Sequence, residues 1–143
     1  QCVITSATDY SRPVYTLGMG CDRGCPIEMI GQLYKQVCND LGPDINLTAF
    51  ASIDLKSNEV GLLELANQIG LNLQTFPAKS LRQVEHQLSV KSDVVFKGVG
   101  CYGVAEAAAL CAASALTGQP AELVITKQKN ARATISVARS YAL

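Results

Sequence analysis

Two glycine-rich segments of the chain could bind an anion through their backbone. The first, Gly18 to Gly24, reads GMGCDRG, and the second, Gly98 to Gly103, reads GVGCYG. Each follows a predicted strand and precedes a predicted helix, so loop N–H groups and the positive end of a helix dipole would face the same site. The alternative is that both are tight strand-to-helix turns that bind nothing.

The second segment also satisfies the G-x-G-x-x-G spacing of dinucleotide-binding loops, and Glu122 follows about twenty residues later. That fingerprint normally occupies the first strand of its unit, whereas here it comes last. Glu122 also begins a predicted strand instead of ending one. Nucleotide binding is therefore kept only as a remote alternative.

Carboxylates near these loops are the candidate acids and bases. Asp54 follows a predicted strand, and in extended chain Asp54 and Lys56 would point the same way around Leu55. The alternative there is a surface ion pair beside a helix cap at Ser57, which contributes little to stability. Glu106 lies in the first turn of the helix predicted after the second glycine-rich segment, where it could act as a general base or complement the helix dipole.

Basic side chains gather around the last predicted hairpin, at Lys127, Lys129, Arg132 and Arg139. The planar guanidinium of arginine matches a carboxylate with two parallel hydrogen bonds. The cluster is therefore interpreted either as a clamp for the carboxylates of a ligand or as a charged turn in solvent.

The sequence gives little support for a metal site or for a catalytic nucleophile. Cys21 and Cys25 are separated by three residues, but the single histidine, His86, falls in a different predicted helix and leaves a zinc site short of ligands. No G-x-S-x-G elbow is present. We expect no protein-bound metal. We also expect reduced thiols, because the spacing of the six cysteines matches no secreted scaffold.

The composition is that of one globular domain. The 143 residues include 12 basic and 12 acidic side chains, and 48% of them are hydrophobic. This balance gives no electrostatic footprint for nucleic acid, and no apolar run is long enough to span a membrane. No signal peptide is visible, so a cytoplasmic location is expected. Residues 1–13 are interpreted as a linker or N-terminal extension, and residues 14–143 as the domain.

Apolar periodicity predicts strands that alternate with helices, the strands lying at 14–19, 47–53, 71–76, 94–97, 122–126 and 134–138. This order indicates a three-layer α/β/α fold with a mixed, mostly parallel sheet of about five to six strands. The last two strands are too close in sequence for a crossover, so they should form a C-terminal antiparallel hairpin. In such sheets ligands bind where parallel strands end.

Four segments in order resemble the motifs of one known family: LGMGCDRG at 17–24, ASIDLKSNEVGLL at 51–63, Gly100 with GVAEAAAL at 103–110, and the closing hairpin from 127 to 139. The first three correspond to LGIGCRRG, ASIDLKADEPGLLELA and GVPGVAEAAAL. Order and spacing agree over residues 14 to 139. The chain thus resembles the family formed by CobE and the C-terminal domain of CbiG in cobalamin (vitamin B12) biosynthesis.

The resemblance implies a module that acts on a precorrin or cobalt-precorrin. The full-length G protein of this family opens the ring-A δ-lactone of cobalt-precorrin-5A and releases a two-carbon fragment as acetaldehyde. The chain resembles only its C-terminal part, so a hydrolase and a non-catalytic carrier of a corrinoid intermediate both stay open. Lactone opening needs no cofactor, and cobalt would arrive inside the tetrapyrrole. Other enzymes of the same pathway are a further candidate class of partner.

Together, the resemblance and the motifs predict one site along an edge of the sheet. Glu106 or Asp54 would be the catalytic base, and the apolar face of the macrocycle would lie on Tyr102 or Leu55. The groups expected to bind the substrate are Gly18, Gly20, Cys21, Arg23, Gly24, Ser52, Lys56, Glu59, Gly100, Tyr102, Gly103, Lys127 and Arg132.

Overall fold

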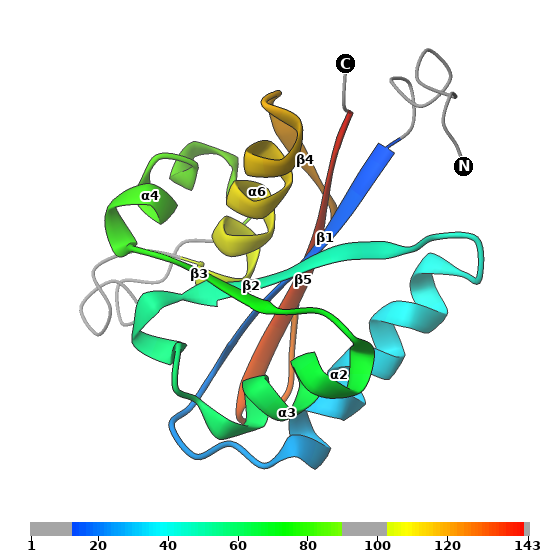
Figure 1. Cartoon of the computed structure of the whole chain (residues 1–143), viewed down its shortest axis with the longest axis vertical. Coiled ribbons are helices and arrows are strands. Elements are labelled where there is room, and N and C mark those ends of the chain that lie inside the picture. Colours follow the sequence, from blue (N-terminus) through cyan, green and yellow to red (C-terminus); the bar gives the residue numbers. More distant parts are fainter. Residues whose placement is uncertain (1–12, 90–102, 142–143) are drawn as a thin grey trace.

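The computed structural model describes residues 13–89 and 103–141, and within them five strands form one sheet in the order β3-β2-β1-β5-β4 (Figure 1). The strands are β1 (Pro13–Cys21), β2 (Leu47–Ile53), β3 (Leu73–Phe76), β4 (Ala121–Lys129) and β5 (Ala133–Tyr141). The strand predicted at 94–97 and nearly all of the predicted extension 1–13 lie outside the described residues.

The sheet is mixed, as predicted, and its pairings divide evenly. β1 pairs with β2 and β2 pairs with β3 in parallel, whereas β5 pairs antiparallel with both β1 and β4. The C-terminal hairpin is confirmed. Because β5 inserts between β1 and β4, the outer strand β4 runs in the same direction as β1.

Helices cover both faces of the sheet, which confirms the three-layer α/β/α arrangement (Figure 1). The pair α2 and α3 packs on one face, and α6 with the short α4 packs on the other. The helices are α2 (Ile27–Leu41), α3 (Val60–Ile69), α4 (Ala78–Arg82) and α6 (Val104–Thr117), with 3-10 turns η1 (Asp54–Lys56) and η2 (Glu85–Gln87).

Large side chains fill the face under α2 and α3. Leu17 and Met19 of β1 and Phe50 of β2 are fully buried there against Ile30 and Leu62. Alternate residues of a strand point to opposite faces, so the residues between these belong to the other layer.

Small residues form the opposite face, under α6. α6 is rich in buried alanines, and Thr16 of β1 donates a hydrogen bond of 2.6 Å to the carbonyl of Ala109 in this helix. A Cβ on Gly18 would collide with the backbone of Ala105 and of Ala109. Glycine at position 18 is therefore required by the close approach of α6 to β1.

Two local predictions at the strand ends are wrong. β1 continues to Cys21, so Gly18 and Gly20 lie inside a strand and not in an anion-binding loop. The helix predicted after an N-cap at Ser57 begins only at Val60. Residues 54–56 form a 3-10 turn instead, and the Ser57 N–H donates to the Asp54 carbonyl to close it. No helix in the described parts of the chain is long and apolar enough to cross a membrane.

Candidate functional site

Four strands, β1, β2, β3 and β4, end at one edge of the sheet, which is called here the carboxyl edge. β1 and β2 are parallel and both end there, and Cys21 pairs with Ala133 at the start of β5. β4 ends at the same edge, where Lys129 pairs with Thr134. In Figure 1 this edge lies at the lower left, where β1 leads to α2 and β2 leads to α3. The structure therefore brings the described loops that carry predicted site residues together.

Arg23 and Glu59 tie the first two loops of this edge to each other. The Arg23 Nη1 lies 3.0 Å from Glu59 Oε1 and donates to Asn58 Oδ1 at 3.0 Å, while Nη2 donates to the carbonyl of Leu55 at 2.6 Å. The other oxygen of Glu59 accepts the backbone N–H of Gly24 at 2.9 Å. The predicted substrate cation Arg23 is thus already engaged in joining the β1–α2 loop to the β2–α3 connection.

The Glu59 carboxylate is almost fully buried, at 2% exposure, whereas the side chain of Arg23 is 57% exposed. Glu59 Oε1 forms an ion pair with Arg23 but accepts no hydrogen bond from the described residues. The ion pair is therefore what compensates the charge on this oxygen. Gly24 has φ of 77°, a left-handed conformation in which glycine avoids the strain of a side chain. The loop therefore needs both its glycine and its buried acceptor.

Glu106 makes a second tie at the same edge. It is 1% exposed, its Oε1 accepts the N–H of Ser89 at 2.9 Å, and its Oε2 accepts the Ser89 hydroxyl at 2.6 Å and the N–H of Lys127 at 2.7 Å. The carboxylate thus joins the start of α6 to β4 and to the segment after η2. Both oxygens of this predicted base face protein donors.

Asp54 differs from Glu106 in that its side chain is exposed at the edge. Its expected alternation with Lys56 is wrong, because the 3-10 turn replaces extended chain at these positions. The neighbouring Ser52 is buried, and its hydroxyl donates to the Met19 carbonyl at 2.6 Å, joining β1 to β2. Asp54 is therefore the accessible member of the two predicted bases.

The hairpin between β4 and β5 brings Arg132 to this edge. Arg132 Nη2 donates to the Arg23 carbonyl at 3.4 Å, and its Nε lies 3.7 Å from the carboxylate of Asp22. Arg139 does not join this group, because it pairs with Tyr15 at the other end of β5 and bonds Glu122. The four-residue basic cluster expected from the sequence is therefore divided between opposite edges.

The two thiols at the carboxyl edge are free and protonated. Burial, and then the charge of Glu59, raise the pKa of Cys21 to about 12, with Lys56 opposing the shift. Burial likewise raises the pKa of Cys25. A protonated thiol is a weak nucleophile and a weak metal ligand. Over the described ranges, acidic residues, cysteines and histidine form no group of three suited to a metal ion.

The remaining residues are three predicted ones of the second glycine loop and two polar ones that were not predicted. Gly100 and Tyr102 lie outside the described residues, while Gly103 precedes α6 with φ of 49°. Asn58 and Ser89 were missed, although both bond the tied carboxylates or their partners. Asn58 stands in the polar stretch after β2, which is a weak signal, but nothing in the sequence marks Ser89.

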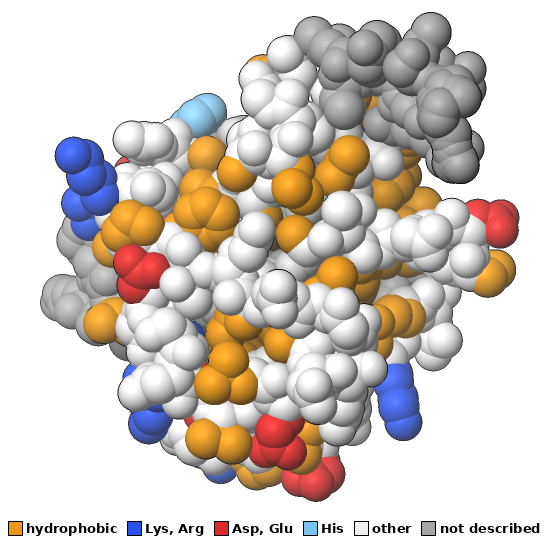
Figure 2. All heavy atoms as spheres, in the orientation of Figure 1, with side chains coloured by type: hydrophobic (Ala, Val, Ile, Leu, Met, Phe, Trp, Pro, Cys, Tyr) orange, Lys and Arg blue, Asp and Glu red, His pale blue; other side chains and the backbone are white. Residues whose placement is uncertain are grey.

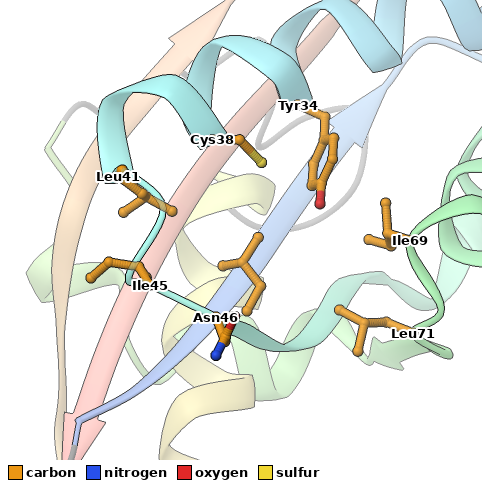
Figure 3. Close-up of a pocket in the computed structure, with 9 residues that line it drawn as sticks. Tyr34, Cys38, Leu41, Ile45, Asn46, Ile69 and Leu71 are labelled. Carbon is orange, nitrogen blue, oxygen red and sulfur yellow. The ribbon is translucent and has the colours of Figure 1, made fainter.

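A pocket of about 230 Å³, lined mostly by apolar side chains, lies at the opposite edge, called here the amino edge (Figure 3). Burial, and then the contact with Cys38, raise the pKa of Tyr34 in this pocket to about 12. The lining contains none of the predicted site residues; it comprises Tyr34, Cys38, Leu41, Gly42, Ile45, Asn46, Leu47, Ile69 and Leu71.

On the face shown in Figure 2, basic side chains are scattered between acidic and apolar ones. This distribution agrees with the even balance of 12 basic and 12 acidic residues. Such a face lacks the stripe of positive charge that nucleic-acid binding proteins present to phosphates.

Comparison with known proteins gives consistent matches. The family model for the cobalamin synthesis G C-terminus matches residues 15–138. A cobalt-precorrin-5A hydrolase of Priestia megaterium is 32% identical over 139 residues, which are 96% of this chain and 35% of that protein. Protein CobE of Sinorhizobium sp is 33% identical over 123 residues, 85% of this chain and 77% of that protein.

The fold matches as well. The crystal structure of CobE, a protein from the cobalamin (vitamin B12) biosynthetic pathway, has a TM-score of 0.84 at 35% identity and covers 92% of this chain and 93% of its own. The chain spans 35% of the length of the Priestia megaterium hydrolase. The carboxyl-edge motifs fall inside the matched residues, and the chain belongs to the cobalamin synthesis G C-terminus family.

Proposed function

We propose that the carboxyl edge binds a precorrin or cobalt-precorrin, and that the chain is a cobalamin-biosynthesis module acting on this intermediate. The observation that carries the proposal is the position of Lys56, Lys127 and Arg132 in segments at the edge where β1, β2, β3 and β4 end. A corrinoid is a flat macrocycle with carboxylates around its margin. Cations spaced along an edge suit such a ligand better than a single deep pocket does.

The apolar part of the ligand also has a partner at this edge. The side chain of Leu55 is 55% exposed in the turn between Asp54 and Lys56, and Val60 at the start of α3 is 65% exposed. An exposed leucine beside a lysine offers contact with the macrocycle face and with a carboxylate at once. The exposure of Leu55 supports its predicted contact with the apolar face of the macrocycle.

For a hydrolase, Asp54 is the carboxylate placed to activate water. A base takes a proton from the water, the oxygen attacks the lactone carbonyl, and the ring C–O bond breaks to give a carboxylate and an alcohol. Backbone N–H groups at the loops would stabilise the negative oxygen that forms during attack. The solvent exposure of Asp54 supports this role.

A non-catalytic carrier is the second candidate, and one observation favours it. The structural likeness to CobE, with a TM-score of 0.84 at 35% identity, extends over nearly all of the described fold. A carrier would hold the corrinoid at the same edge and use Asp54 for binding only.

Titration with cobyrinic acid, followed by visible absorbance, tests binding. We expect a spectral shift whose affinity falls with added salt, because the contacts are between exposed charges. Lys56→Ala combined with Lys127→Ala should weaken binding at least about tenfold, equivalent to about 1.4 kcal/mol. Lys35→Ala, on the exposed side of α2, is the matched control. Absence of a shift, together with tight nicotinamide binding, would support the nucleotide-binding alternative.

Acetaldehyde release from cobalt-precorrin-5A separates the hydrolase from the carrier. Release by this chain, lost in Asp54→Asn with binding retained, supports the hydrolase. Binding without release supports the carrier. Release that appears only when the N-terminal half of a longer relative is added assigns a part of the catalytic site to that half.

A further inference from the structure

Two buried carboxylates lie at helix N-termini of the carboxyl edge. Glu59 is the residue before α3, and Glu106 lies in the first turn of α6. Each accepts a backbone N–H from a different loop of the edge, Gly24 for Glu59 and Lys127 for Glu106. The resulting ties connect the loop after β1 to α3, and β4 to α6.

Burial at these positions opposes folding unless the charge is compensated. A carboxylate removed from water costs several kcal/mol unless it is paired or hydrogen-bonded. Glu106, at 1% exposure, meets this need with three donors, and Glu59, at 2%, meets it with Gly24 and Arg23. These donors and the Arg23 cation all belong to segments of the carboxyl edge, so these carboxylates hold the segments to the helices.

Geometry argues against a general base at Glu106. A base must reach the proton that it abstracts at hydrogen-bond distance, directly or through one water. Its Oε1 already accepts the Ser89 N–H, and its Oε2 accepts both the Ser89 hydroxyl and the Lys127 N–H. A water at Oε2 would have to displace one of these donors. Oε1 keeps one acceptor position, but the side chain is only 1% exposed, so burial limits the access of water to it.

We propose that Glu59 and Glu106 are positioning residues, which fix the loops of the carboxyl edge in the arrangement that receives the corrinoid, and that Glu106 is not the general base. Glu59 acts through Arg23 and Gly24, and Glu106 acts through Lys127 and Ser89. This inference rests on the proposed function only for the identity of the ligand.

Backbone amide exchange, measured by NMR on the whole chain, tests the ties without any ligand. The Ser89 N–H and the Lys127 N–H bond different oxygens of Glu106. Glutamine at position 106 has one acceptor oxygen and one NH2 donor, so it cannot accept both backbone N–H groups in the present arrangement. Glu106→Gln should raise the exchange rate of the Lys127 or Ser89 amide at least about tenfold and leave Gly24 unchanged. Glu59→Gln should leave Lys127 and Ser89 at wild-type rates.

Glu64→Gln, an exposed position on α3, is the control for the loss of a carboxylate. It should leave all three amides unchanged. Unaltered exchange at both Lys127 and Ser89 in a folded Glu106→Gln protein would overturn the inference.

Ligand binding and pH dependence then separate positioning from catalysis. Glu106→Gln should weaken cobyrinic acid binding about tenfold and keep the acid limb of any pH–rate profile. A general base would show the reverse, with unchanged affinity, lost turnover and a missing acid limb. Failure of the wild-type chain to bind cobyrinic acid would defeat the proposed function, while the exchange rates would still decide the ties.

Discussion

The two edges of the sheet are built from different chemistry. At the carboxyl edge, buried carboxylates and exposed cations hold three connections together, and Asp54 remains accessible. At the amino edge, Tyr34, Leu41 and Leu71 help to line a pocket of about 230 Å³, which is smaller than the range of about 300–1,000 Å³ usual for ligand sites. The proposed site therefore rests on charge and strand direction at the carboxyl edge and not on cavity volume.

The largest expected effect comes from the glycine that lets α6 approach β1. Gly18→Ala should lower the free energy of unfolding by about 3 kcal/mol or more, because the new Cβ would meet the backbone of Ala105 and Ala109. It should also weaken corrinoid binding by displacing the start of α6. Urea denaturation measures the first effect. Gly31→Ala is the control, since a Cβ there meets nothing within 4 Å and should stabilise α2 by about 0.5–1 kcal/mol.

Matched arginine variants compare the ion pairs of the two edges. Arg23→Ala leaves the buried Glu59 without its cation and should cost about 1–2 kcal/mol, less than a fully buried pair because Arg23 is half exposed. Arg139→Ala removes a pair with Glu122, whose side chain is 55% exposed, and should cost below about 1 kcal/mol. Urea unfolding at low and high salt measures both. Equal losses would mean that the two edges do not differ in this respect.

The free energy of unfolding should begin to fall at a lower pH because of the carboxyl-edge thiols than because of Tyr34 at the amino edge. The pKa of Cys21 is raised from 9.0 to about 12, so above pH 9 the unfolded chain loses this proton before the folded chain does. Stability therefore falls as pH rises from 9 to 12. Tyr34, raised from 10.0 to about 12, adds a loss that starts only above pH 10. The pKa of Cys25 is also raised by burial, so Cys21→Ala should reduce the loss that starts near pH 9, and Cys21→Ala with Cys25→Ala should remove it. Tyr34→Phe should remove the later part, in urea titrations across this range.

A substitution in the amino-edge pocket should change the affinity for cobyrinic acid least. Leu71→Ala enlarges the amino-edge pocket and should reduce stability, because partly buried methyl groups that pack on the core are removed. Affinity for cobyrinic acid should stay within about twofold of wild type, since no carboxyl-edge contact changes. Absorbance titration checks this result, and a loss comparable to that of the Lys56 and Lys127 variants would place the ligand at the wrong edge.

Local patterns in the sequence predicted much of the fold. The strand at 47–53 was predicted with the bounds that β2 has, and the helix from Val104 and the final hairpin were also found. These elements are set by periodicity, glycine stops and short connections, which neighbouring residues determine. The resemblance to the family was visible for the same reason, since its motifs are contiguous.

Long-range contacts account for what the sequence could not show. The local sequence predicts that Gly18 begins a glycine-rich loop, yet glycine is required there by α6, which follows it by nearly ninety residues in the chain. Glu106 was predicted as a base from its place beside a glycine loop. Its burial depends on Ser89 and on the N–H of Lys127, and neither contact leaves a pattern in the sequence.

The most direct test of the account is to follow backbone amide shifts by NMR while cobyrinic acid is added to the chain. We predict that Gly24, Lys56, Lys127 and Arg132 shift together and saturate at one ligand concentration, while Tyr34 and Leu71 stay in place. Shifts confined to the amino-edge pocket, or saturating shifts at neither edge, would contradict a corrinoid site at the carboxyl edge.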